Sequence, residues 1–357
     1  MFLKKLDKAV GPLLARLWLQ PTRPDPLHSP VSRLLLIRPG GIGDAVLLAP
    51  TIKLLRDVFP EARLEVLAEA RNRGVFAFCP GIDEVLCYDS PRELLAVLRR
   101  NYDVVIDTEQ WHYLSALVTR VIRSGTKIGF GTNQRQRLFT HPVEYNRDNY
   151  ELHIFFELLK PLGIEAPATI PSPFLTIQEK EHELAGSLLG AFLEEPFVVL
   201  FPGASTSEKC WAVENFRQLA GRFFDKGLPV VVVGGKEEVV AGSIIVAGTC
   251  GLNLAGETSL GGTASVLSRS QLLVSGDSGV LHIGAGLGVP TVSLFGPGDP
   301  AKWAPRGKQH VAISHKLPCA PCTRFGTTPS CPINAKCILG ISVDEVFVAA
   351  QKLLALT

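Results

Sequence analysis

The sequence lacks the marks of several large classes of protein. No apolar run approaches the roughly 20 residues that a membrane-spanning helix needs, and the amino-terminal segment does not end in the small residues of a secretory cleavage site. No dense block of lysine and arginine occurs in the body of the chain, and the formal net charge is only +2. The sequence therefore predicts no transmembrane helix, no cleaved leader and no nucleic-acid partner.

The composition is that of a globular protein of ordinary kind. The chain has 357 residues, of which 46% are hydrophobic and 20% are charged. That length accommodates two domains, each with its own core. Disorder is excluded as the main state, because a chain with this much apolar side-chain area can bury a core.

Residues 1–30 differ from the rest of the chain. In residues 1–20, apolar side chains recur at helical spacing and alternate with Lys4, Lys5, Lys8 and Arg16. Such a basic amphipathic helix can lie on an anionic membrane face, or it can pack on the body of the protein or on a partner. Four prolines between residues 21 and 30 then form a stiff spacer.

From residue 31 onward, strands and helices alternate. We expect strands at 33–38, 63–68, 82–88 and 103–107, helices at 91–101, 111–124 and 150–163, and a basic loop at 125–139. A proline-rich stretch at 166–175 predicts a domain boundary. We therefore expect domains at 31–170 and 171–342, and a helix at 343–357 that packs back across the boundary.

The most informative stretch is the first turn. A buried strand ends at Arg38-Pro39, and the glycines Gly40, Gly41 and Gly43 then lead into a helix that contains Asp44. Glycines allow a ligand to approach the backbone, and the helix start favours an anion. We predict that Asp44 is the working residue, and that Gly41 and Gly43 make room for an acceptor.

Two common nucleotide motifs fail to match. A dinucleotide fingerprint requires a third glycine where this chain has Val46. A phosphate loop of the nucleotide-hydrolase kind requires a glycine in place of Val230 and a hydroxyl in place of Glu237. The sequence thus argues against hydride transfer and against nucleotide hydrolysis.

Two turns in the second half favour a phosphate-bearing ligand. The first, residues 202–209, offers glycine, the hydroxyls of Ser205 and Thr206, and the cation of Lys209. The second, Gly276-Asp277-Ser278-Gly279, lies at a helix start, and His282 follows about one turn later. Together they describe a diphosphate cradle at the carboxyl ends of parallel strands.

These residues resemble glycosyltransferase family 9, the ADP-heptose:lipopolysaccharide heptosyltransferases. The resemblance extends over about residues 33–355 and rests on separated motifs that occur in order. They are residues 38–44 with Pro50, residues 202–205 with Lys209 and Trp211, Gly234-Gly235 with Glu238, residues 253–260, and residues 276–282 with 288–290 and 295–297.

The resemblance implies an α/β fold of the GT-B architecture, with two Rossmann-like domains whose parallel sheets face a central cleft. It implies that Asp44 is the general base, that Ser205 and Lys209 hold the donor phosphates with Thr206 beside them, and that Glu238 binds the adenosine ribose. Asp277, Ser278, Gly279 and His282 would lie beside the diphosphate. The family inverts the anomeric centre.

The residues agree with this chemistry. Inverting transfer needs one base on the acceptor hydroxyl and positive charge for the leaving diphosphate. The chain has no Asp-x-Asp pair, the usual clamp for a metal-bound sugar nucleotide, so we expect no catalytic metal. Lys127, Arg135 and Arg137 in the basic loop would suit a phosphorylated, lipid-linked acceptor, although each can also be read as a solvated surface charge.

Four of the eight cysteines cluster near the carboxyl end, at Cys319, Cys322, Cys331 and Cys337. Four thiolates can form a structural zinc or iron–sulfur site. Two disulfides or four reduced thiols are the alternatives, and a cytosolic location disfavours the disulfides.

The sequence thus predicts an inverting, metal-independent glycosyltransferase that moves a heptose or related sugar from an ADP-sugar to a lipopolysaccharide core. We expect it in the cytoplasm, as a soluble protein or peripherally on the inner face of the inner membrane. The alternatives are the same fold with a different nucleotide-sugar donor, and a non-catalytic nucleotide- or glycan-binding module at the membrane surface.

Overall fold

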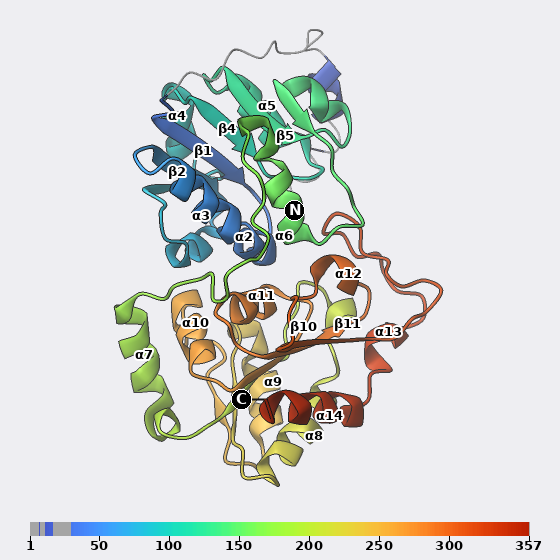
Figure 1. Cartoon of the computed structure of the whole chain (residues 1–357). Helices are drawn as coiled ribbons and strands as arrows, with labels where there is room; N and C mark the ends of the chain where they lie inside the picture. The colour runs from blue at the N-terminus through green and yellow to red at the C-terminus, as the bar shows by residue number, and fades with distance from the viewer. Residues whose placement is uncertain (1–6, 8–10, 17–29, 357) are drawn as a thin grey trace. The chain divides into compact units, whose positions relative to one another are not determined.

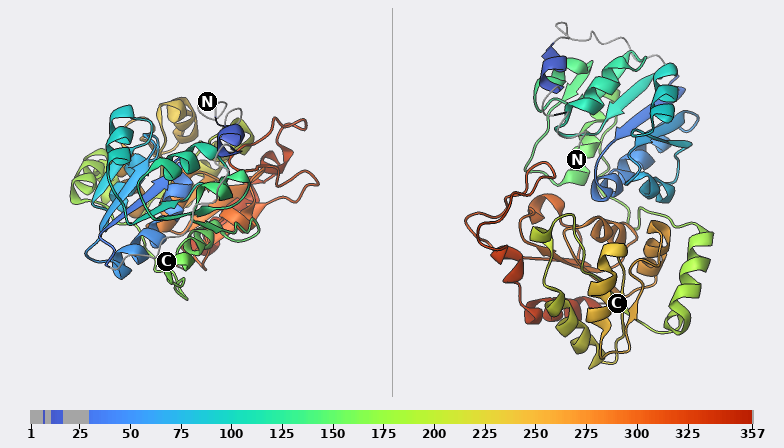
Figure 2. Two further views of the ribbon diagram at one scale, coloured as in Figure 1. Left: turned by 90° about the horizontal axis from the view of Figure 1, so that it is seen from above. Right: turned by 180° about the vertical axis from the view of Figure 1, so that it is seen from behind.

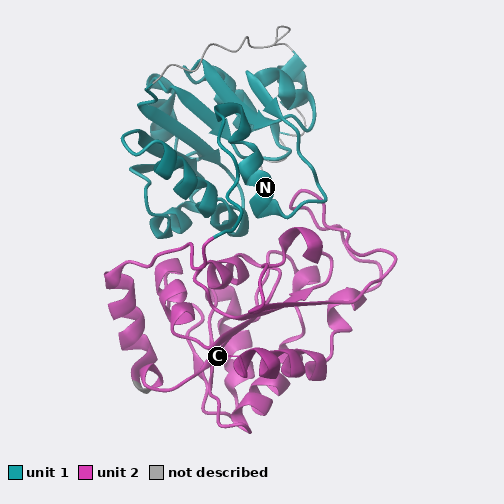
Figure 3. Cartoon of the chain, in the orientation of Figure 1, with its two compact units in different colours: residues 1–170 teal, residues 171–357 magenta. Residues whose placement is uncertain are grey.

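The computed structural model describes residues 7, 11–16 and 30–356. The chain divides into two compact units, residues 1–170 and 171–357 (Figure 3). Each unit contains one six-stranded parallel sheet with helices packed along it (Figure 1). This confirms the predicted α/β fold with two Rossmann-like domains.

The first unit has the strand order β3-β2-β1-β4-β5-β6. Its strands are β1 (Arg33–Arg38), β2 (Arg63–Ala68), β3 (Glu84–Cys87), β4 (Val104–Asp107), β5 (Thr126–Phe130) and β6 (His141–Val143). Its helices are α2 (Ile42–Leu47), α3 (Ala49–Val58), α4 (Pro91–Arg99), α5 (Tyr113–Val121) and α6 (Glu151–Glu157), with 3-10 turns η1 (Arg73–Phe78), η2 (Gln134–Leu138) and η3 (Lys160–Leu162).

The second unit repeats this topology, with the order β12-β11-β10-β7-β8-β9. Its strands are β7 (Val198–Phe201), β8 (Val230–Val232), β9 (Leu252–Asn253), β10 (Leu272–Gly276), β11 (Thr291–Phe295) and β12 (His310–Ser314). Its helices are α7 (Glu179–Leu189), α8 (Val213–Phe224), α9 (Val239–Val246), α10 (Leu260–Ser268), α11 (Gly279–Gly286), α12 (Pro300–Trp303), α13 (Lys336–Leu339) and α14 (Val343–Leu354), with 3-10 turns η4 (Gly190–Leu193), η5 (Ser207–Lys209) and η6 (Lys236–Glu238).

The strand order defines one switch point in each sheet. Successive strands extend the sheet to one side of the first strand, and the fourth strand then starts the other side. The switch lies between β1 and β4 in the first unit and between β7 and β10 in the second. Ligands of such sheets bind at the carboxyl ends of these strands, so each unit has one expected binding position.

The predicted helix after the first turn is divided in two. α2 ends at Leu47 and α3 begins at Ala49, with Pro50 in its first turn. Proline has no N–H to donate, so it fits a helix start better than a helix interior. Pro50 therefore coincides with the start of a new helix and not with the interior of a continuous one.

The prediction of a loop at 125–139 was wrong. Residues 126–130 form β5, and every residue of that strand is buried. Lys127 is among them, with 5% of its side chain exposed. Its ammonium donates to the carbonyl of Arg120 at 2.7 Å, which allows a charged residue to lie inside a buried strand.

The last helix packs on the second unit. α14 lies beside α8 and strands β10–β12 of its own unit (Figures 1 and 2). Its buried residues Val346, Ala350 and Leu353 belong to the core of the second unit. Ser342 and Glu345 form a capping box at its start, because they exchange hydrogen bonds.

Part of the amino-terminal segment falls within the described residues. Residues 11–16 are helical, and Ala15 is completely buried against Ala116 and Leu138. Asp7 accepts a hydrogen bond from the backbone N–H of Leu114 at 2.6 Å. The described part thus packs on the body of the first unit. The remainder of residues 1–20 and most of the proline spacer lie outside the described residues.

Candidate functional site

Asp44 lies at the switch point of the first unit, on the carboxyl side of β1. Gly40 has φ +112°, a conformation that L side chains rarely adopt, and α2 then starts at Ile42 with Gly41 as its N-cap. Asp44 is in the first turn of α2, where the helix dipole favours a negative charge. The glycine turn therefore delivers one carboxylate to the expected binding position of this unit.

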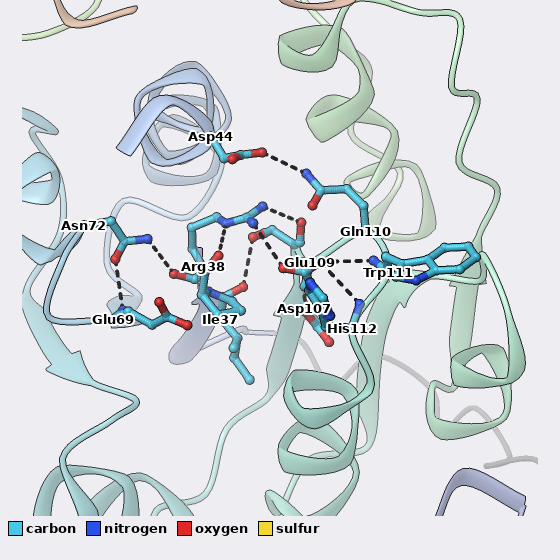
Figure 4. Close-up of polar contacts among 12 residues, drawn as sticks. Ile37, Arg38, Asp44, Glu69, Asn72, Asp107, Glu109, Gln110, Trp111 and His112 are labelled. Carbon is cyan, nitrogen blue, oxygen red and sulfur yellow. Dashed lines mark hydrogen bonds and ion pairs between the residues drawn. The ribbon is translucent and has the colours of Figure 1, made fainter. Parts of the chain in front are cut away.

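The loop after β4 supplies the partner of this carboxylate. Gln110 Nε2 donates to Asp44 Oδ1 at 3.1 Å and to Glu151 Oε1 at 2.7 Å. Figure 4 shows Gln110, in the loop after β4, pointing toward Asp44. A methyl group at Gly41 would lie 3.2 Å from Asp44 Oδ2, so the second oxygen is turned toward the glycine turn.

A buried guanidinium neutralises part of this acidic cluster. Arg38 is 1% exposed and donates to the carbonyl of Thr108 at 2.8 Å and to Glu109 Oε2 at 3.3 Å. Burial by itself would lower the pKa of Arg38, but the carboxylates of Asp44, Glu109, Glu151 and Asp107 raise it above its ordinary value. Arg38 therefore stays charged and lies among acidic groups, with Asp44 above it and Glu109 beside it in Figure 4.

Arg135, predicted as an acceptor residue, forms a buried ion pair instead. Its guanidinium lies 2.8 Å from Asp107, and both side chains have 0% exposure. It also donates to the carbonyl of Glu109. Arg135 and Lys127 thus both direct their charges into the unit. Only Arg137 of the three predicted basic residues is exposed.

The switch point of the second unit brings two predicted donor residues together. Lys209, after β7, lies 2.6 Å from Asp277, after β10. Both side chains are about nine-tenths buried, at 13% and 10% exposure. Only a glycine fits at position 298 beside this pair, because the Cβ of any other residue would lie 2.4 Å from Asp277 Oδ2. One cation and one carboxylate thus occupy the centre of the expected phosphate position.

Glu238 and the residues of the first loop lie close by. Glu238 Oε2 accepts from the backbone N–H of Gly235 at 2.7 Å, and Glu238 Oε1 would lie 2.6 Å from a Cβ at Gly203. Ser205 is exposed, while the hydroxyl of Thr206 is buried and has no hydrogen-bond partner among the described residues. The carboxyl ends of β10, β7 and β8, which are neighbours, therefore carry the predicted donor residues.

The turn after β10 has the predicted helix start. Ser278 is the N-cap of α11, and its Oγ accepts from the N–H of Leu281 at 3.2 Å. Gly279 begins the helix, and His282 follows inside it with 3% exposure. The His282 ring packs edge-on against Trp303, with ring centroids 6.5 Å apart. His282 is thus held in the interior of the unit behind the turn.

The four clustered cysteines form no disulfide, and neither do the other four. Burial raises the pKa of Cys322, and the neighbouring thiols Cys319 and Cys331 add to this rise. The pKa of Cys337 is raised in the same way, by burial and then by its neighbours. Within the ranges that the structure describes, no group of three or more histidine, cysteine, aspartate or glutamate side chains is arranged to hold a metal ion.

Sequence reasoning missed Gln110, Glu151 and Tyr145. They lie 66 to 107 positions beyond Asp44 in the sequence and carry no motif of their own. Glu151 is completely buried as the first residue of α6, within the helix expected at 150–163, and the sequence alone does not show that burial. Their contacts became visible only in the fold.

Comparison with known proteins finds relatives that cover most of the chain. The chain is 25% identical over 310 residues to lipooligosaccharide heptosyltransferase 2 of Haemophilus ducreyi, covering 79% of this chain and 88% of the relative. Among solved structures it is similar to a family 9 glycosyl transferase from Veillonella parvula (TM-score 0.78, 22% identity, covering 91% and 98% of the two chains). It is also similar to E. coli ADP-heptose lps heptosyltransferase II (TM-score 0.76, 22% identity, covering 91% and 99%).

These structural likenesses support the GT-B fold class. The model of glycosyltransferase family 9 (heptosyltransferase) matches residues 92–331, which include the donor residues of the second unit and the loop after β4. The chain therefore belongs to glycosyltransferase family 9 and is a glycosyltransferase.

Proposed function

We propose that this protein transfers a heptose, or a related sugar, from an ADP-sugar to a lipopolysaccharide core or a similar lipid-linked glycan. The relative from Haemophilus ducreyi and the E. coli structure carry heptosyltransferase names that support this substrate class. The observation that carries the proposal is Asp44, a carboxylate held at the switch point of the first unit with one oxygen directed to a glycine turn.

Asp44 acts as the general base. As the acceptor oxygen attacks the anomeric carbon, the acceptor O–H bond breaks and its proton passes to the carboxylate. The bond between that carbon and the diphosphate oxygen breaks on the opposite face, so the anomeric centre inverts. Gly41 and Gly43 leave room for the acceptor hydroxyl, and the exposed guanidinium of Arg137 suits an acidic acceptor.

The second unit binds the donor. Lys209 meets the charge that develops on the leaving diphosphate, with Ser205, Thr206 and the α11 start at Ser278 and Gly279 as further donors. Asp277 holds Lys209 in place, and His282 supports the turn from behind. Glu238 binds the ribose hydroxyls. The reaction needs no metal in this scheme, because Lys209 and backbone N–H groups supply the positive charge.

We further propose that the enzyme acts at the inner face of the inner membrane, where a lipid-linked acceptor is available. The basic residues of positions 1–20 would favour an anionic surface. Among the described residues, no helix is long and apolar enough to cross a membrane.

The four-cysteine segment can hold a structural zinc or an iron–sulfur cluster only if its thiols rearrange around the metal, since their described arrangement is not that of a metal site. Elemental analysis of protein purified without chelators tests this. One metal equivalent that is lost in a Cys322→Ser variant supports the site, and a metal content below a tenth of an equivalent argues against it.

Two experiments test the proposed activity. Mass analysis of the product from a panel of ADP-sugars and a lipopolysaccharide precursor identifies the transferred sugar, and titration with ADP, UDP and GDP identifies the base. Tightest binding of UDP would contradict the adenine donor. An Asp44→Asn variant that loses turnover by about 10²–10⁴-fold but binds ADP normally supports the base, while unchanged turnover would rule out Asp44 as the base. Nucleotide binding without transfer from any donor by the wild-type protein would indicate a non-catalytic binding module.

A further inference from the structure

The amide of Gln110 bridges two carboxylates on the first unit. Its Nε2 carries two hydrogens, and these are directed to Asp44 Oδ1 and Glu151 Oε1, at 3.1 and 2.7 Å. Gln110 is 7% exposed, and Glu151 is completely buried. Both hydrogens of the amide are therefore committed to fixed acceptors in a nearly dry environment, where hydrogen bonds are strong.

The far end of this chain of hydrogen bonds is also fixed. The hydroxyl of Tyr145 donates to Glu151 Oε2 at 2.9 Å, and the Tyr145 ring packs edge-on against Phe130 with centroids 5.0 Å apart. The backbone of Gln110 is held as well, because the Thr132 hydroxyl donates to its carbonyl at 2.6 Å. Gln110 thus has little freedom in either its main chain or its side chain.

The consequence for Asp44 is a defined carboxylate orientation. Oδ1 is occupied by Gln110, and Oδ2 has no hydrogen-bond donor within the described part of the chain. Oδ2 faces Gly41, where even one added methyl group would come within 3.2 Å. The oxygen that is still able to accept a proton is therefore the one next to the smallest residue of the turn.

We propose that Gln110, held by Glu151 and Tyr145, is a positioning residue that orients Asp44 so that Oδ2 receives the proton of the acceptor hydroxyl. This inference rests on the proposed role of Asp44 as the base. The proton moves from the acceptor oxygen to Oδ2, the acceptor oxygen forms the new bond to the anomeric carbon, and the diphosphate leaves with the electron pair of the broken bond. Gln110 remains unchanged throughout.

Several charged and titratable groups surround this carboxylate in the first unit. Arg38 faces it from β1, Glu109 from the loop after β4, and Glu151 with Tyr145 from α6 and the segment before it. The hydrogen bond from Gln110 favours the ionised carboxylate over the protonated one. Its removal should therefore move the acid limb of the pH–rate profile to higher pH. A role limited to holding the fold together would not move that limb.

Two variants and one matched control test the proposal. Gln110→Leu removes both hydrogen bonds at nearly the same volume, and Tyr145→Phe removes only the hydroxyl that holds Glu151. Tyr102→Phe is the control, because the Tyr102 hydroxyl also donates to a completely buried glutamate, Glu65, at 2.7 Å in the same unit. For each variant, kcat, the KM for the acceptor, ADP affinity, the acid limb and the melting temperature are measured.

We expect Gln110→Leu to lower kcat by about 10- to 100-fold, since a misplaced catalytic group can cost about 10²-fold. ADP affinity should stay within about twofold, because the donor residues lie in the second unit. Tyr145→Phe should shift the acid limb in the same direction by less, and Tyr102→Phe should leave it in place. If Gln110→Leu does not fold, Tyr145→Phe alone decides the question by the same readout.

The proposal is overturned if neither Gln110→Leu nor Tyr145→Phe moves the acid limb, whatever happens to the melting temperature. That failure is distinguishable from failure of the base itself. If Asp44→Asn remains active, the proposal that Asp44 is the base is wrong. If Asp44→Asn is inactive but Gln110→Leu has a normal kcat and a normal acid limb, only the positioning role of Gln110 is wrong.

Discussion

Replacement of Arg135 by methionine separates a structural role from an acceptor-binding role. The Arg135–Asp107 pair is 2.8 Å long, and both side chains are completely buried. Removal of one partner of such a pair leaves a buried charge uncompensated, which costs about 3–5 kcal/mol. We therefore expect Arg135→Met to lower the free energy of unfolding of the first unit by about that amount.

The loss should depend on pH in a defined direction. Burial raises the pKa of Asp107 even though Arg135 opposes the shift. For a carboxyl group whose pKa is raised on folding, the folded state binds the proton more tightly, so stability is highest at low pH and is lost as pH rises through the folded value. Without Arg135 the upward shift is larger. The difference between wild type and variant should thus grow as the pH rises above the ordinary range of a carboxyl group.

Urea titrations read by pulsed hydrogen exchange can follow each unit through its own peptides. Arg137→Met is the matched control, because its exposed side chain should change the unfolding free energy by less than about 0.5 kcal/mol. The second unit should unfold as in wild type in both variants. An Arg135→Met protein with normal stability and a raised KM for the acceptor would refute the structural role and restore the acceptor role.

Two further substitutions test each unit separately. Lys209→Met should weaken ADP binding by about 10- to 100-fold in calorimetry, since a hydrogen bond to a charged group contributes about 1.5–3 kcal/mol. Lys226→Met, which replaces an exposed lysine, is the control. Equal ADP affinity in the two variants would exclude Lys209 from the phosphate site. Gly41→Ala should change the melting temperature little, because φ of Gly41 is an ordinary −75°. It should lower kcat, because the added methyl group would lie 3.2 Å from Asp44 Oδ2. A normal kcat would show that this side of the carboxylate is not used.

Much of the fold could be predicted because buried parallel strands read as short apolar runs. β1 and β2 were expected over the residues that the structure assigns to them, and the turn at residues 276–279 lies at the end of β10 as predicted. The edge strands β6, β9 and β12 were missed. They are two to five residues long and partly exposed, so their sequences lack the continuous apolar pattern that identifies a central strand.

The candidate site was harder to predict, for a different reason. Asp44 and Lys209 carry signals in the sequence, because glycine turns and hydroxyl-rich loops have recognisable local chemistry. Whether a charged side chain points into the protein or into solvent leaves no such local signal in the sequence. Arg135 and Arg137 are two residues apart in one basic segment, yet one is completely buried and the other exposed. Only the position of Asp107 at the end of β4, 28 residues earlier, decides which of them is paired.

The most direct test of the central claim is a single-turnover measurement with Asp44→Asn, excess enzyme and a saturating ADP-heptose donor. Asparagine keeps the size of the side chain and its position in α2 but cannot accept the proton. The account predicts that the rate of sugar transfer falls by about 10²–10⁴-fold while the donor dissociation constant stays within about twofold of wild type. A transfer rate equal to that of wild type would contradict the claim that Asp44 is the base.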